Sequence, residues 1–248
     1  MKTKIILTLI FLFSFGFNHA QSYHFANLTV EDGLSQNDVV SILQDKRGLL
    51  WMATKGGGLT IFDGVVYSYL KQEDGLNSNI VYCLYQDSQE NVWIGTYDGL
   101  VKYDGQNIET YTTAHGLNSN IIKTICEDTQ GRLWVGTENG GVSILSALRD
   151  SLEVNFTSYE SRGPYIGNNF NKIIESSDGK MWLGSTKGLI LAEDSKTTLY
   201  SRKTNMIGNN VLDILEDLKG NLWVVTNKGL CKFNGKTFFN YSSNNGFP

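Results

Sequence analysis

The sequence predicts an all-β protein assembled from one repeated unit of four short antiparallel strands. Three observations support this prediction. Strand-like runs recur within every repeat, turn residues separate them, and the tryptophans are regularly spaced, with successive ones 42, 41, 48 and 41 residues apart. All five tryptophans lie in equivalent phrases: Trp51, Trp93, Trp134, Trp182 and Trp223. A period in this range is typical of arrays in which each repeat is a small antiparallel sheet.

The unit around Trp93 gives the elements in order. "NIVYCLYQD", "VWIGT", "LVKY" and "IETYTT" are four runs rich in β-branched and aromatic residues, and "SQEN", "YDG" and "DGQN" separate them. Such runs, bounded by Gly, Asn and Asp, are typical of strands joined by hairpins. Tight turns that need positive φ angles are expected at Asp63-Gly64, Asp104-Gly105 and Asn234-Gly235.

One four-stranded unit cannot bury both of its faces, so the units are expected to pack face to face around an axis as the blades of a β-propeller. Each repeated Trp could bury roughly 150 to 250 Å² between blades. At about 25 cal/mol per Å² this contributes about 4 to 6 kcal/mol before opposing terms. We therefore interpret the five tryptophans as packing residues between blades, because one ligand would hardly contact the same residue of every blade.

Three further sets of residues recur in step with the tryptophans, and we expect structural roles for them. A Thr or Ser follows each Trp by three residues: Thr54, Thr96, Thr137, Ser185 and Thr226. A Gly follows by six: Gly57, Gly99, Gly140, Gly188 and Gly229. An Asn precedes each Trp, at Asn37, Asn79, Asn120, Asn168 and Asn209. Asn at such a junction commonly bonds the backbone of its own turn.

The N-terminus reads as a secretory signal peptide over residues 1–20, with repeats over residues 21–248. Lys2 and Lys4 precede an apolar run from Ile5 to Phe17, and Ala20 offers a cleavage point. The run is shorter than the ~20 residues that span a bilayer, which favours a cleaved signal peptide over the alternative, an uncleaved anchor. A periplasmic or secreted location is therefore expected.

Composition excludes several classes of function. Loss of residues 1–20 would leave a formal charge of about −6, which does not attract nucleic acid. No Cys and His cluster has metal-ligand spacing and no Gly-rich phosphate loop precedes a helix, so no metal or other cofactor is expected. The cysteines Cys83, Cys126 and Cys231 are odd in number, which excludes a closed disulfide framework and favours buried free thiols.

The repeat also resembles a known family. The phrase "EDGLNSNIVYCLYQDSQENVWIGTYDGLVKYDG" and its relatives are similar to the two-component regulator propeller repeat, and the resemblance extends over residues 23–248. It implies the periplasmic sensor region of a hybrid two-component or histidine kinase receptor that responds to glycan fragments. It further implies membrane and kinase segments in a longer receptor, which could be a dimer. No such segment follows the repeats here, which is a departure from the family pattern.

The two ends of the sequence predict an incomplete ring. "YHFANLT" near the start resembles the outer strand of a unit, but "TFFNYS" near the end already supplies that strand to the fifth unit. The final "SSNNGFP" resembles a linker into another unit. We therefore expect five blades in an open, truncated arc with exposed sheet edges, which favour aggregation.

Ligand-binding residues are expected where equivalent loop positions differ between units, because structural demands are shared and ligand demands are not. The candidates on the face that carries the loop after each Trp strand are Lys55, Tyr97, Asp98, Glu138, Asn139, Lys187, Asn227 and Lys228, with Asn77, His115 and Asn118 from neighbouring loops. Aromatic, amide and charged groups together suit an oligosaccharide or another small ligand.

Two other classes of function stay open at this point. Propellers also host glycosidases and lyases, and Glu138 with Asp98 could act as a pair of carboxylates. However, no nucleophile elbow is visible and no catalytic residue is predicted. The third class is a scaffold that binds another protein on a flat face. The sequence favours a non-catalytic ligand-binding sensor.

Overall fold

The computed structural model describes residues 27–146, 155–159, 169–193 and 196–243, and within them the fold is all-β. Four-stranded antiparallel sheets form the five blades. Blade 1 contains β1 (Val39–Gln44), β2 (Leu50–Thr54), β3 (Leu59–Phe62) and β4 (Tyr67–Leu70); blade 2 contains β5 (Val81–Gln86), β6 (Val92–Thr96), β7 (Gly99–Tyr103) and β8 (Ile108–Tyr111). Blade 3 contains β9 (Ile122–Glu127), β10 (Leu133–Thr137), β11 (Val142–Leu145) and β12 (Phe156–Ser158). Blade 4 contains β13 (Phe170–Glu175), β14 (Met181–Ser185), β15 (Gly188–Glu193) and β16 (Lys196–Tyr200); blade 5 contains β17 (Val211–Glu216), β18 (Leu222–Thr226), β19 (Gly229–Phe233) and β20 (Phe238–Tyr241).

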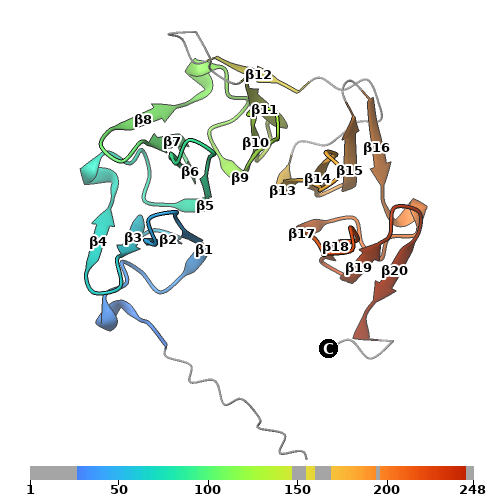
Figure 1. Ribbon diagram of the computed structural model, residues 1–248, viewed down its shortest axis with the longest axis horizontal. Helices are drawn as coiled ribbons and strands as arrows, with labels where there is room; N and C mark the ends of the chain where they lie inside the picture. Colours follow the sequence, from blue (N-terminus) through green and yellow to red (C-terminus); the bar gives the residue numbers. More distant parts are fainter. Residues whose placement is uncertain (1–26, 147–154, 160–168, 194–195, 244–248) are drawn as a thin grey trace, which may run out of the picture.

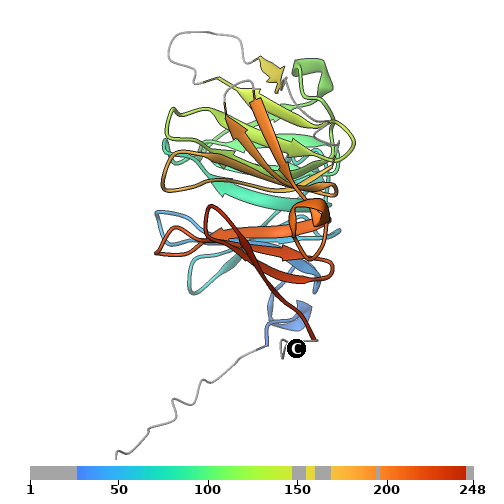
Figure 2. The same cartoon turned by 90° about the vertical axis from the view of Figure 1, so that its right-hand side faces the viewer.

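The blades stand in an arc around a common axis (Figure 1). The first strand of each blade lies nearest the axis and the fourth lies at the rim, as the strand orders require. Short 3-10 turns at the rim lead into four of the blades: η1 (Val30–Asp32), η2 (Gln72–Asp74), η3 (Thr113–His115) and η4 (Arg202–Thr204). The ring is not closed, because blades 1 and 5 lie at the two ends of the arc (Figure 1). Figure 2 shows the same blades from the side. The predicted open propeller is confirmed.

The tryptophans pack between blades, as predicted, in four of the five units. Trp51, Trp93, Trp134 and Trp182 are buried, and each belongs to a hydrophobic cluster whose other members come largely from the following blade. Trp93, for example, lies with Ile122 and Val135 of blade 3. Trp223 of blade 5 is only partly buried.

A second role of the tryptophans was not predicted. Each indole Nε1 donates a hydrogen bond to the residue six positions earlier, across the β-hairpin that precedes the Trp. The acceptors are Asp45, Asp87, Asp128, Ser176 and Asp217, at 2.8 to 3.1 Å. A buried indole N–H needs such a partner. The hairpin residue, an Asp in four units and Ser176 in blade 4, therefore fixes both the turn and the Trp ring.

The recurring Thr, Gly and Asn residues serve the turns, as expected. The hydroxyl that follows each Trp donates to a backbone carbonyl of the next loop, as Thr96 Oγ1 does to Gly99 O at 2.8 Å. Gly99 itself has φ 129°, a conformation that favours glycine. Asn79 Oδ1 accepts from Gln72 N at 2.8 Å, and the equivalent atoms of three other described units do the same. Asn168 lies outside the described residues.

The three cysteines are free thiols, which confirms the prediction; Cys126 and Cys231 are buried and Cys83 is partly buried. Residues 1–26, which include the predicted signal peptide, lie outside the described residues. In the described part of the chain, no helix is long and apolar enough to cross a membrane.

Candidate functional site

The innermost strands turn one side chain per blade toward the axis through a local irregularity near the strand start. Their pairing register shifts there, for example between Val81 and Cys83 of β5. Such a bulge re-aims a side chain and interrupts the pairing. The residues at this position are Val40, Tyr82, Lys123, Asn171 and Leu212. Apolar, aromatic, cationic and amide side chains thus replace one another around the axis.

These residues line a cavity of about 570 Å³ on the inner side of the arc. Its wall is formed by the first strands of all five blades. Lys172 Nζ lies 3.1 Å from Asp213 Oδ1, so this pair joins blades 4 and 5 across the cavity wall. Asn171 Nδ2 donates to Val211 O at 2.7 Å across the same interface. The cavity is therefore polar and built by several blades together.

Beside this wall lies the group Tyr82, Tyr97, Lys123 and Glu138, which we call the axial cluster. Tyr82 and Lys123 line the cavity, and Tyr97 and Glu138 come from the loops that follow β6 and β10. Lys123 Nζ lies 3.8 Å from the centre of the Tyr82 ring, a cation–π contact. It also lies 3.7 Å from Glu138 Oε2. Burial, and secondarily the charges of Glu138 and Tyr97, raise the pKa of Tyr82, so its hydroxyl stays protonated at neutral pH.

The axial cluster can recognise a polar ligand with apolar faces. Tyr97 is 50% exposed, so its ring is open to a stacking partner. The Lys123 and Glu138 side chains retain 27% and 41% exposure, which leaves donor and acceptor positions open to solvent. An aromatic platform beside paired donors and acceptors matches the alternating apolar faces and hydroxyls of a sugar ring.

Two of the predicted site residues, Tyr97 and Glu138, thus both lie near Tyr82. Asp98 and Asn77 lie in the same loop layer, where the Asn77 side chain donates to the Asp98 carbonyl oxygen. Asp98 Oδ1 accepts from Asn120 Nδ2 at 3.3 Å. The two carboxylates suggested as a catalytic pair therefore have different partners, since Glu138 pairs with Lys123.

The other predicted residues are distributed over separate blades. Asn139 N donates to Asn169 Oδ1 at 2.6 Å, and Asn118 Nδ2 donates to Val142 O at 3.0 Å, so both serve contacts within and between blades. His115 lies in a rim turn, where its Nδ1 accepts from Thr112 N at 3.0 Å. The remaining candidates are exposed loop residues of blades 1, 4 and 5: Lys55, Lys187, Asn227 and Lys228.

Sequence reasoning missed the half of the axial cluster that comes from strands. Tyr82 and Lys123 stand at equivalent positions of β5 and β9, one residue after the buried Val81 and Ile122. The rule used for the loops would have found them, because this strand position differs in every unit while the residue before it is a large apolar one in each. The rule was applied to loops alone.

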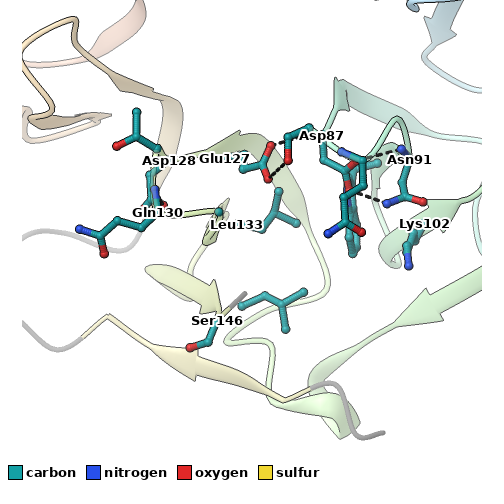
Figure 3. Close-up of a pocket in the computed structure, with 14 residues that line it drawn as sticks. Asp87, Asn91, Lys102, Glu127, Asp128, Gln130, Leu133 and Ser146 are labelled. Carbon is teal, nitrogen blue, oxygen red and sulfur yellow. Dashed lines mark hydrogen bonds between the residues drawn. The ribbon is translucent and has the colours of Figure 1, made fainter. Parts of the chain in front are cut away.

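A second cavity, of about 390 Å³, lies between blades 2 and 3, where it is lined by residues of their first hairpins (Figure 3). Several of its polar groups are engaged in hydrogen bonds within and between the two blades. Glu127 accepts from Ser88 N and Oγ at 2.7 and 2.8 Å, and Asn91 Nδ2 donates to Asp87 Oδ2 at 2.7 Å. The Glu127 contact recurs between later blades as Thr129 with Glu175. Because it repeats, we interpret this groove as blade packing.

Metal chemistry has no visible basis in the part of the chain that the structure describes. No group of three or more His, Cys, Asp or Glu residues there is placed to hold an ion.

Fold and cavity together define a β-propeller of four-stranded blades with a polar axial cavity. Residues 33–56, 75–98 and 116–139 match the family model described as the two component regulator propeller. The chain therefore carries repeats of the two-component regulator propeller family, as its sequence resemblance indicated. Comparison with curated proteins gives no match.

Solved structures give the same result for the fold. The chain is 29% identical, with a TM-score of 0.74, to the extracellular domain of the protein assigned as hybrid two component system BT3049 from B. thetaiotaomicron. The aligned region covers 86% of this chain and 30% of the BT3049 domain. A second extracellular domain, of BT4673 from the same organism, is 22% identical with a TM-score of 0.71, and the coverage is 83% and 31%.

One enzyme has a similar fold. Virginiamycin B lyase from Staphylococcus aureus is 16% identical with a TM-score of 0.64, covering 83% of this chain and 70% of the lyase. At this identity the likeness concerns the fold alone. The chain spans about a third of the length of the two receptor domains.

Proposed function

We propose that this protein is the non-catalytic, exported ligand-binding sensor region of a two-component signalling receptor, and that glycan fragments bind at the axial cluster. The observation that carries the proposal is the set of axial side chains that differ from blade to blade. Positions that only build blades repeat, as the tryptophans do. Tyr82, Lys123 and their loop partners instead form one specific group.

The signalling part of the proposal is supported by the receptor neighbours. Both are extracellular domains of larger assemblies, and this chain aligns with only part of each. Further blades, a membrane span, a histidine kinase and a dimeric receptor belong to this proposal, as does the N-terminal signal peptide. The membrane span and the histidine kinase would convert ligand binding at the axial cluster into a signal.

Ligand binding is tested with the purified protein and a panel of neutral and acidic oligosaccharides. We expect at least one sugar to raise the melting temperature progressively as its concentration increases, because a ligand that binds only the native state stabilises it. Isothermal titration then gives the affinity of that sugar. A panel without any shift would contradict the glycan proposal.

The site is tested with Tyr82→Ala and Tyr97→Ala. A matched control exists at the rim, where Tyr69 is 44% exposed and Lys71 Nζ lies 5.6 Å from its ring centre. We expect both axial variants to weaken binding at least tenfold and Tyr69→Ala to leave it unchanged. Equal effects of all three would place the ligand elsewhere.

The scaffold and lyase alternatives have distinct outcomes. A scaffold would retain a protein from periplasmic extract, and that capture would survive Tyr97→Ala. A glycosidase or lyase would release reducing ends or unsaturated products from a polysaccharide, and Glu138→Gln would abolish the release. We expect neither result.

A further inference from the structure

The four interfaces between neighbouring blades share one packing rule. The residue two positions after the Trp is Gly95, Gly136 or Gly184 in blades 2 to 4 and the small Ala53 in blade 1. A Cβ at Gly184 would lie 2.7 Å from Val211 Cγ1 and 3.1 Å from Ile214 Cδ1 of blade 5. A small residue on one blade thus receives large β-branched or aromatic residues of the next.

The neighbours of Gly95 and Gly136 follow the same rule. A Cβ at Gly95 would lie 2.8 Å from Ile122 Cγ2, and one at Gly136 would lie 3.0 Å from Phe170 Cβ. These partners occupy one position, the first residue of the innermost strand of the following blade. The equivalent residue of blade 1 is Val39, and Ile42 of blade 1 is equivalent to Ile214.

Blade 5 breaks this rule on its outward face. The residue two positions after Trp223 is Val225, which is 40% exposed. The residue after the acceptor of the Trp indole, which is Ser88, Thr129 or Ser177 in blades 2 to 4 and bonds a Glu of the following blade, is Leu218 here. Leu218 is fully exposed.

The rest of the face is built like the covered ones. Trp223 Nε1 donates to Asp217 Oδ2 at 3.0 Å, and the Trp223 ring stacks on Tyr241 with centroids 5.8 Å apart. Leu215, which pairs with Trp223, is 67% exposed, whereas the equivalent Cys126 of blade 3 is buried. The face is thus built like an interblade surface, but it carries the large residue Val225 where the other blades carry a small one.

From these contacts we infer that the outward face of blade 5 receives a further four-stranded blade with a small residue, Gly, Ala or Ser, at the position equivalent to Val211. The occupant is a blade because Trp223, Asp217 and Tyr241 continue the geometry of the four existing interfaces. A large residue at that position of the added blade would collide with Val225, whereas blades 1 to 4 have Ala or Gly at the position of Val225. Blade 1 cannot take this place in the same register, since it carries Val39.

The test joins a sixth unit to the full chain. In the sequence, Gly246 and Phe247 are equivalent to Gly75 and Leu76, so a copy of residues 78–112 placed after Pro248 continues the repeat in step. Within the copy, Val81 is equivalent to Val211. One version keeps this Val81, and the other carries Val81→Ala in the copy only.

Each version of the copy is joined to the chain with Val225 and to the chain with Val225→Gly. The melting temperature of each of these four proteins is compared with that of the corresponding chain without the copy. We expect the Ala version to raise the melting temperature by several degrees more than the Val version when Val225 is present. With Val225→Gly we expect the opposite order. Val225→Ala should give an intermediate result, which guards against a folding defect of the Gly variant.

Three outcomes overturn the inference. The same order on both backgrounds would show that Val225 does not select its partner. Failure of both copies to stabilise the Val225 chain would show that the face does not receive a blade. A dimer of the unmodified chain in gel filtration that Leu215→Asp dissolves would assign the face to a second copy. None of these outcomes depends on sugar binding at the axial cluster.

Discussion

Replacement of one Trp in the middle of the arc and one at its end isolates the energy of a blade interface. Trp93 and Trp223 have nearly the same surroundings within their own blades. Each bonds an Asp carboxylate, stacks on a Tyr and lies under a Lys, with Lys Nζ 5.9 and 5.2 Å from the two ring centres. The difference is the following blade, which packs on Trp93.

The expected effects differ accordingly. Trp93 is 4% exposed, and Trp→Ala at such a position costs about 3–5 kcal/mol. Trp223 already contacts water. If roughly 60 Å² of its ring remains exposed, about 25 cal/mol per Å² makes its replacement about 1.5 kcal/mol less costly. Loss of the indole donor removes one hydrogen bond from an Asp carboxylate in each variant. Because Asp87 is buried and Asp217 is partly exposed, this loss also costs more at Trp93.

Urea unfolding followed by far-ultraviolet circular dichroism measures both variants, since this signal does not depend on a single indole. We expect Trp93→Ala to lower the free energy of unfolding by more than Trp223→Ala, with similar m-values. Equal losses, or a larger loss at Trp223, would refute the assignment of the tryptophans as interblade residues.

Three more predictions follow from the same contacts. Gly136→Val should lower stability by about 1–3 kcal/mol in urea unfolding, because its side chain would meet Phe170. Burial raises the pKa of Cys83 to about 12 and of Cys126 to about 11, so at pH 8 Ellman's reagent should modify neither in the native protein but should modify both after denaturation. Burial raises the pKa of the Asp45 carboxyl, but hydrogen bonds from Trp51 and Arg47 outweigh this effect and hold that pKa below 3.8. The melting temperature should therefore be constant down to about pH 4 and should fall at lower pH, as the Asp45 carboxylate is protonated.

The fold was predictable because each unit repeats its chemistry. A Trp fixes the second strand, and the residues between strands are turn formers whose side chains bond the backbone; Asp104 Oδ1, for example, accepts from Gln106 N and Asn107 N. Five copies of one local pattern make register and strand order redundant. The bond from Trp Nε1 to the hairpin Asp was missed, although the six-residue spacing is visible in four of the units.

The site was less predictable because it depends on which blades become neighbours at the axis. Tyr97 and Glu138 were expected from their loops, but the sequence alone did not pair Glu138 with Lys123 of a strand. Strand register shifts near the axis decide that Tyr82 and Lys123 point inward. The same shift occurs in all five blades, but which side chains it brings together depends on which blades become neighbours.

Equivalent positions in a repeat protein can be compared within a single chain, and the comparison separates two kinds of departure from the pattern. Tyr82 and Lys123 differ at a position that lines the axial cavity, where blade packing requires no common side chain, so their variation is compatible with the fold and available to a ligand. Val225 differs at a position where every other blade needs a small residue, so its variation changes what can dock there. The first kind of departure defines a binding surface. The second defines an interface, and its partner must compensate for the change in volume.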